Sequence, residues 1–234
     1  RLSSGASITG TVFANSGVEV GEGSKVIGNI YTPGDLKVSG SGERIKGNAT
    51  AFGTTSLSGN NLKITGNIFI SHSITLGQEI KIDGDLYVVG NLLINSWGPE
   101  VNGNVYVSGS LTLDHRVSII GDVFVDGAVD LSAAQVKIDG NLSMGQSFAS
   151  IDHHQKVSGT VAITSQAGST VNTQVFSSLN AHLDAVKNKF LAGDTVRRTN
   201  ELEFSICSLE DRSLSIDRDI EHFIDGHQPF SGVK

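Results

Sequence analysis

The sequence lacks most of the residues and patterns that define common functional classes. Its single cysteine, Cys207, excludes an intrachain disulfide and a cysteine-based zinc site. No apolar run reaches the length of about 18 residues that crosses a bilayer, so we expect no membrane span within this chain. Charged residues make up 18%, the net charge is −7 and lysine and arginine form no run. We therefore expect no nucleic acid as a partner.

Catalytic motifs are also missing. There is no Walker loop, nucleophile elbow or HExxH, and no helical pattern follows the glycine-rich stretch 39–44. The strongest local group is Asp152, His153 and His154, whose side chains are candidates for metal binding or proton transfer. Because neighbouring turns add no further ligands, we expect this group not to form a metal site. We also expect that the protein binds no cofactor and is not an enzyme. The enzyme alternatives are a polysaccharide lyase or hydrolase and a hexapeptide acyltransferase.

What the sequence does contain is an internal repeat. A glycine followed by Asn, Asp or Thr and then a small or aliphatic residue recurs nine times, at intervals of 18 or 19 residues. These glycines are Gly10, Gly28, Gly47, Gly66, Gly84, Gly103, Gly121, Gly140 and Gly159. Such a period is typical of a solenoid, in which each repeat stacks on its neighbours.

Each repeat contains three short apolar-x-apolar triplets, as in Leu62/Ile64, Ile68/Ile70 and Ile74/Leu76. A period of two indicates a strand with one buried face, so three triplets predict three strands and a triangular cross-section. We predict a mainly β protein, with a parallel β-helix of about nine three-stranded rungs over residues 5–170. Parallel crossovers favour a right-handed coil. The alternative is the left-handed hexapeptide helix.

The residue after each repeat glycine is most often Asn or Asp, for example Asn67 and Asp85. Both residues tolerate positive φ better than most, so we interpret them as corner residues. Asp85 and Asp122 are separated by Asn104, which keeps like charges off adjacent rungs.

An aromatic residue lies two positions further on in most repeats, where alternation turns it away from the interior. These residues are Phe13, Tyr31, Phe69, Tyr87, Tyr106 and Phe124. A contiguous apolar stripe of this kind is expected to be covered by another segment of the chain or to bind a partner. Residues 173–191 have helical periodicity, and we expect this helix to lie along the rod on the ladder. The alternative is that the helix caps the last rung.

The remaining C-terminal sequence predicts a strand at 201–207 and a helix at 213–225. Residues 171–234 are therefore expected to form an α+β appendage of helix, strand and helix, packed on the solenoid. The single tryptophan, Trp97, lies in a corner that resembles an insertion and is a candidate contact for a partner.

Four rungs carry a resemblance to a known family. VIGNIYTPGDLKV, IDGDLYVVGNLLI, VNGNVYVSGSLTL and IIGDVFVDGAVDL resemble the bactofilins, polymer-forming cytoskeletal β-helices of bacteria. They are also similar to β-solenoid segments of exported bacterial proteins linked to pili and adhesion. The resemblance to bactofilins implies a scaffold without enzymatic activity that polymerises by end-to-end stacking. The long C-terminal appendage departs from the bactofilin pattern.

These features predict a structural protein that acts as a rigid spacer. Its partner is expected to be a second copy, joined edge to edge at the first rung (Ile8, Val12, Val18 and Val20), or another protein. The alternative function is a cell-surface adhesin or carbohydrate-binding module that binds a glycan through Trp97 or the aromatic ladder. We expect this protein in the bacterial cell envelope or outside the cell rather than in the cytoplasm.

Overall fold

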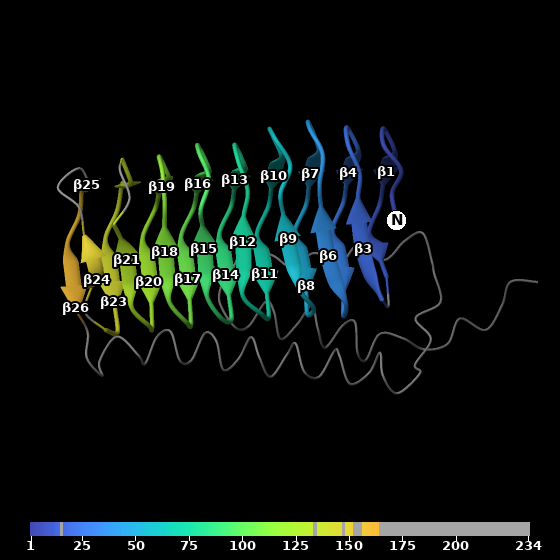
Figure 1. Ribbon diagram of the computed structural model, residues 1–234. Coiled ribbons are helices and arrows are strands. Elements are labelled where there is room, and N and C mark those ends of the chain that lie inside the picture. Colours follow the sequence, from blue (N-terminus) through green and yellow to red (C-terminus); the bar gives the residue numbers. More distant parts are fainter. Residues whose placement is uncertain (15, 133–134, 147, 152–155, 164–234) are drawn as a thin grey trace, which may run out of the picture.

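The chain forms a rod of stacked parallel strands. The computed structural model describes residues 1–14, 16–132, 135–146, 148–151 and 156–163. Within these ranges 26 strands form three sheets and every strand pair is parallel (Figure 1). The same ranges contain no helix, and hence none that could span a membrane. The predicted appendage, 171–234, lies outside the described residues.

The three sheets take every third strand in chain order, and we number them 1 to 3. Sheet 1 contains β1 (Ser7–Thr9), β4 (Lys25–Ile27), β7 (Arg44–Lys46), β10 (Lys63–Thr65), β13 (Lys81–Asp83), β16 (Glu100–Asn102), β19 (Ser118–Ile120), β22 (Lys137–Ile138) and β25 (Lys156–Val157). Sheet 2 contains β2 (Val12–Phe13), β5 (Ile30–Thr32), β8 (Ala49–Ala51), β11 (Ile68–Ile70), β14 (Leu86–Val88), β17 (Val105–Val107), β20 (Val123–Val125), β23 (Leu142–Met144) and β26 (Val161–Ile163). Sheet 3 contains β3 (Gly17–Val20), β6 (Asp35–Val38), β9 (Thr55–Leu57), β12 (Ile74–Leu76), β15 (Leu92–Ile94), β18 (Leu111–Leu113), β21 (Val129–Leu131) and β24 (Phe148–Ile151).

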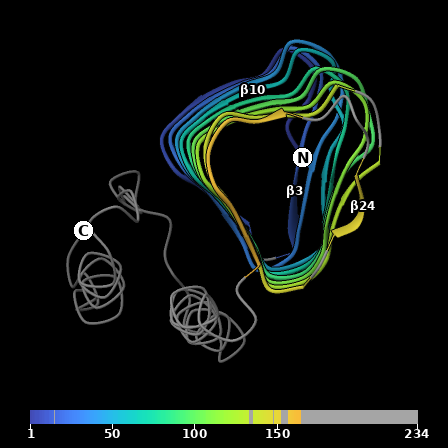
Figure 2. The ribbon, with the colours of Figure 1, turned by 90° about the vertical axis from the view of Figure 1, so that its left-hand side faces the viewer.

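The cross-section is triangular, with one sheet on each side (Figure 2). Seen from the end that carries β26, the chain passes counterclockwise from sheet 1 to sheet 2 to sheet 3 as it advances toward the viewer. The coil is therefore right-handed. The described strands make eight complete turns and two strands of a ninth, β25 and β26. The predicted three-stranded parallel β-helix is confirmed.

The interior is a continuous aliphatic core. Ile64, Ile68, Ile70 and Leu76, from three successive strands, are all 0% exposed. Each stacks on the equivalent residue of the next turn, as Ile68 does on Leu86. The alternation of apolar residues therefore places one triplet on each side of the triangle, and every turn buries its aliphatic groups against two neighbours.

Glycine is required where sheet 1 turns into sheet 2, because successive turns approach closely there. Gly66 has a φ of 140°, and a Cβ at this position would lie well inside van der Waals contact with the carbonyl of Gly47. The same overlap would occur at Gly28 and Gly47 against the preceding repeat glycine. The glycine period in the sequence thus reflects close backbone contact as well as positive φ.

The Asn and Asp residues after these glycines have a different role from the predicted one. Within the described ranges, none of them has positive φ. Instead, each side-chain oxygen accepts a hydrogen bond from the backbone N–H of its counterpart one turn later. The distances are 2.9 Å from Asn67 Oδ1 to Asp85 N, 2.7 Å from Asp85 Oδ1 to Asn104 N and 2.9 Å from Asn104 Oδ1 to Asp122 N. Asn and Asp are interchangeable here because only the acceptor oxygen is used.

Candidate functional surfaces

The outer face of sheet 2 carries the predicted aromatic ladder. Phe69, Tyr87, Tyr106 and Phe124 occupy register positions on four adjacent strands. Their rings are nearly parallel, with centroid separations of 5.0, 4.6 and 5.0 Å along the series. Offset stacking at such distances is favourable by about 0.5–1.5 kcal/mol per pair beyond the burial of area.

The ladder is interrupted on the strand before Phe69, where Thr50 takes the aromatic position. On the far side of Thr50, Tyr31 packs against Phe13 with a centroid distance of 5.4 Å. Phe52, which follows β8 in the chain, contacts the Tyr31 ring edge-on at 5.6 Å. Phe52 thus supplies the ring contact that Thr50 cannot make.

Much of this outer layer is shielded from solvent. Tyr31, Phe69 and Tyr87 are at most 2% exposed. They are nevertheless separate from the interior core, which contains Ile68 and Ile70 on either side of Phe69 but not Phe69 itself. Burial raises the pKa of Tyr31 and of Tyr87, whose hydroxyl donates to Asp85 Oδ2 at 3.3 Å. These three rings are consequently closed to a soluble glycan. The helix expected on the ladder, 173–191, lies outside the described residues and stays a prediction.

Trp97 lies in the corner between sheet 3 and sheet 1, and its side chain is 51% exposed. The next turn brings two residues, His115 and Arg116, against it. The Arg116 guanidinium carbon is 4.6 Å from the indole centroid, which is a cation–π distance, and the His115 ring is 5.8 Å away. Arg116 Nε also donates to Gln135 Oε1 at 2.6 Å.

The backbone of this corner is unusual. Glu79, His115, Arg116 and Gln135 all have φ between 47° and 69°, a region that non-glycine residues seldom adopt. Residues held in this region tend to cluster at ligand sites, because the surrounding structure must offset their cost. Trp97, His115 and Arg116 thus bring an indole, an imidazole and a guanidinium together on the surface of this corner.

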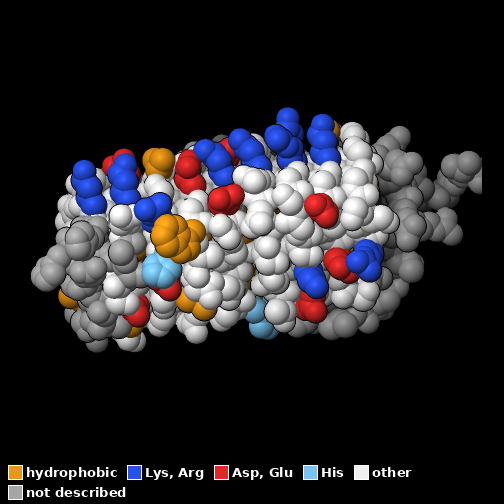
Figure 3. Space-filling view, turned by 45° about the horizontal axis from the view of Figure 1, so that its top comes forward, with side chains coloured by type: hydrophobic (Ala, Val, Ile, Leu, Met, Phe, Trp, Pro, Cys, Tyr) orange, Lys and Arg blue, Asp and Glu red, His pale blue; other side chains and the backbone are white. Residues whose placement is uncertain are grey.

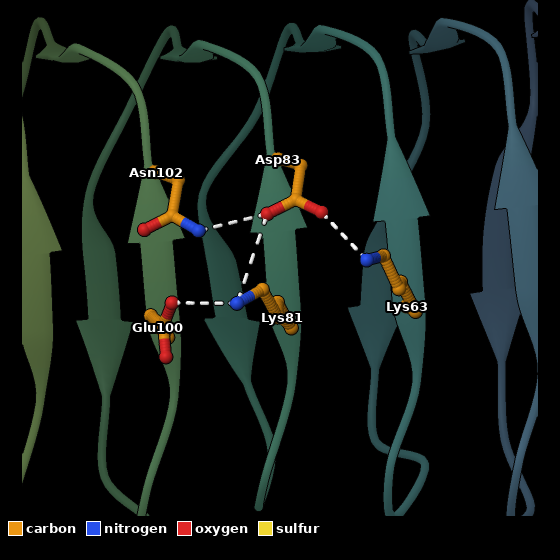
Figure 4. A network of polar contacts seen from close by, with 5 residues as sticks. All are labelled: Lys63, Lys81, Asp83, Glu100 and Asn102. Carbon is orange, nitrogen blue, oxygen red and sulfur yellow. Dashed lines mark hydrogen bonds and ion pairs between the residues drawn. The ribbon is translucent and has the colours of Figure 1, made fainter.

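The outer face of sheet 1 is charged. Figure 4 shows its central part, where a lysine on one strand reaches a carboxylate on the next strand. Lys63 Nζ is 2.8 Å from Asp83 Oδ2, and Lys81 Nζ is 2.7 Å from Glu100 Oε1. Asn102 Nδ2 donates to Asp83 Oδ1 at 2.8 Å.

These contacts set the pKa values of the central carboxylates. The hydrogen bond from Lys63 lowers the pKa of Asp83, and the hydrogen bond from Lys81 lowers the pKa of Glu100. The hydrogen bond to Glu100 in turn raises the pKa of Lys81. All these groups are consequently charged at neutral pH.

The two ends of the rod differ from its middle. At the first turn Val20 is buried, and Leu2 forms a parallel bridge with it, so this edge of sheet 3 is partly covered. Leu2 thus occupies part of the first-rung edge at which a second copy was expected to join. Strands β1 and β2 have a strand neighbour on one side only within the described chain, and Ile8 and Val12 are half-buried.

At the last described turn, Val161 and Ile163 occupy the positions that Leu142 and Met144 fill one turn earlier. Leu142 and Met144 are fully buried, whereas Val161 is 43% and Ile163 is 56% exposed. The core-facing residues of the last described turn are therefore exposed.

The metal candidates Asp152, His153 and His154 lie outside the described residues. Within the described ranges, no group of three or more His, Cys, Asp and Glu side chains is arranged to hold a metal ion. The sequence alone indicated Trp97 but not its contacts with His115 and Arg116, and it gave no indication of the charged face of sheet 1. In both cases a signal existed, since the residues that meet are 18 to 20 positions apart, which is about one repeat.

Comparison of the chain with protein-family models, with curated proteins and with solved structures found no match.

Proposed function

We propose that this chain is a non-enzymatic structural rod that assembles head to tail through the open ends of its coil. The observation that carries the proposal is the exposure of Val161 and Ile163, which are core-facing residues at the last described turn. An exposed end of a solenoid core requires either a cap or another apolar edge.

The first turn offers a matching edge. Ile8 and Val12 are half-buried, Val12 packs against the core, and β1 and β2 run in the same direction as β25 and β26. A second copy stacked on this edge would extend two sheets as parallel ladders. Because the two joined surfaces differ, the contact is heterologous and leaves an open edge at each end, so it permits growth of a filament. The resemblance to bactofilins, which polymerise end to end, agrees with this proposal.

Sedimentation velocity over a concentration series, with negative-stain microscopy, tests the proposal. We expect the full chain to form straight rods that lengthen with concentration, and the variant Ile163→Lys to sediment as a monomer. Ile163 is already exposed, so the substitution should leave the fold intact by circular dichroism. Thr75→Lys, which adds the same charge to an exposed position of sheet 3, is the matched control and should assemble normally. A wild-type chain that stays monomeric at high concentration would contradict the proposal.

A second candidate function, a carbohydrate-binding module or adhesin, is favoured by the half-exposed indole of Trp97. Aromatic rings that project from a corner next to an arginine are suited to stacking on a sugar ring. A glycan-array measurement separates this function from the first one. Trp97→Ala should abolish binding, whereas Ile120→Ala, at another exposed apolar residue, should not. Unchanged binding by Trp97→Ala would exclude this site.

A further inference from the structure

The fold gathers cations that are far apart in the sequence. Residues 1–163 contain ten lysines and arginines, and seven of them lie on strands of sheet 1. These are Lys25, Arg44, Lys46, Lys63, Lys81, Lys137 and Lys156. Figure 3 shows the resulting row of basic side chains along the upper edge of the rod. The net charge of the chain is negative, so this basic row is a local feature of one face.

Four of these cations are in single file. Lys25 pairs in register with Arg44, Arg44 with Lys63 and Lys63 with Lys81. We call these four residues the cation column. Neighbouring strands lie about 4.8 Å apart, so the column places one positive charge at each such step along the rod axis. Like charges directly opposite one another are destabilising, and an anion bound along the column would relieve that repulsion.

The two halves of the column differ in their partners. Lys63 and Lys81 form ion pairs with Asp83 and Glu100. Within the described part of the chain, Lys25, Arg44 and Lys46 have no ion-pair partner, and all three side chains are exposed. The anion-accepting part of sheet 1 is therefore centred on β4 and β7.

We propose that the cation column binds a linear acidic polysaccharide that lies along the rod axis, with an anionic group near each strand. Arg44 provides a planar fork of donors that suits a carboxylate or sulfate, and the lysines act as point charges on either side. This binding does not depend on self-assembly, because the column lies within one chain.

The composition of the rest of this face decides between possible polyanions. A bilayer would contact both outward columns of sheet 1, but the second column contains Asp83 and Asp139 as well as Lys46. Single-stranded nucleic acid binds through aromatic platforms as well as cations, and the described strands of sheet 1 contain no aromatic residue. A single file of charge without stacking groups suits a polymer of acidic sugars.

Isothermal titration of the dilute full chain with a polygalacturonate fragment long enough to span the four strands tests the proposal. We expect the acidic fragment to bind and a neutral maltooligosaccharide of equal length not to bind. Because counterions are released, the affinity should fall on the order of tenfold or more between about 50 mM and about 200 mM salt. The double variant Lys25→Glu/Arg44→Glu should lose about tenfold or more in affinity at low salt.

The control is Lys37→Glu, which makes the same change at an exposed position of sheet 3 and should bind as the wild type does. An undiminished affinity of the double variant, or an equal loss in Lys37→Glu, would overturn the proposal. Tighter binding to oligothymidylate, or to vesicles of phosphatidylcholine and phosphatidylglycerol, would also overturn it by assigning the face to another occupant. Sedimentation of the double variant reports separately on self-assembly, which these substitutions should leave unchanged.

Discussion

The outer faces of sheet 1 and sheet 2 are built on the same geometry but carry opposite chemistry. Both stack one outward side chain on the next at each turn, in register. On sheet 2 the stacked residues are aromatic rings, of which Phe69 and Tyr87 are buried, so repetition adds favourable contacts. On sheet 1 they are cations in solvent, so repetition adds repulsion. A repeated ladder thus contributes stability on one face and exposes a charged row on the other.

The largest effect is expected at the corner that joins these two sheets. Gly66→Val introduces a side chain that overlaps the Gly47 carbonyl, at a φ that valine strongly disfavours. We expect a loss of more than about 4 kcal/mol in the free energy of unfolding, measured by urea denaturation. Gly5→Val is the control, since a Cβ there has no neighbour within 4 Å and φ is again positive. Similar losses in both variants would mean that φ alone, and not close approach, requires glycine.

Removing one ring from the sheet 2 ladder should cost nearly as much. Tyr87→Ala deletes a side chain that is 2% exposed and stacked on both sides, so we expect a loss of about 3–5 kcal/mol. Lys81→Ala changes a residue in the same turn of the coil, on the outer face of sheet 1. It removes only a solvent-exposed ion pair, so it should leave the urea midpoint nearly unchanged. Equal losses in the two variants would remove the distinction between the faces.

The break in the aromatic ladder offers a stabilising substitution. Thr50 is 2% exposed, and its hydroxyl has no hydrogen-bond partner within the described chain. Thr50→Val keeps the shape and removes the buried hydroxyl, so the free energy of unfolding should rise by about 1 kcal/mol. Thr75→Val, at an exposed position of sheet 3, is the control and should have little effect. A loss of stability in Thr50→Val would show that this hydroxyl is hydrogen-bonded after all.

The smallest effect concerns the ion pairs of sheet 1. The folded pKa of Asp83 is below its ordinary value, so its stabilising contribution is present above about pH 4 and is lost as the pH falls through the folded pKa. Asp83→Asn should therefore reduce stability by less than about 1 kcal/mol at neutral pH. Thermal unfolding from neutral to acid pH measures this difference, which should shrink toward zero in acid. A difference that persists in acid would exclude the ion pair as its cause.

The core could be predicted from the sequence because each triplet is local. Ile68 and Ile70 are two positions apart, and that spacing alone specifies a strand with one buried face. The corner was only partly predicted. Asn67 and Asp85 were correctly placed at a turn, but their role is hydrogen bonding between turns, and propensity scales give no sign of that.

The surfaces were harder to predict because they combine residues from different turns. Each lysine or arginine of the cation column is isolated along the chain, so a search for basic runs finds nothing. Stacking at 18 or 19 residues creates the row. The same offset separates Trp97 from Arg116, which explains why their contact was not foreseen. Once a solenoid period is known, the sequence can be aligned turn by turn, and both groups become visible.

The hydrogen bonds from Asn and Asp side chains to the following turn also govern how such a rod can change in length. Each turn offers one acceptor oxygen and one donor amide, so the addition or removal of a complete turn leaves every member of the series paired. The offset between members is 18 in some pairs and 19 in others, and the corner between sheet 3 and sheet 1 absorbs the extra residue, as it does between Ile94 and Glu100. The length of the rod therefore changes in steps of one complete turn. Duplication of a sequence segment that encodes a turn would lengthen the rod and leave its interior packing unchanged.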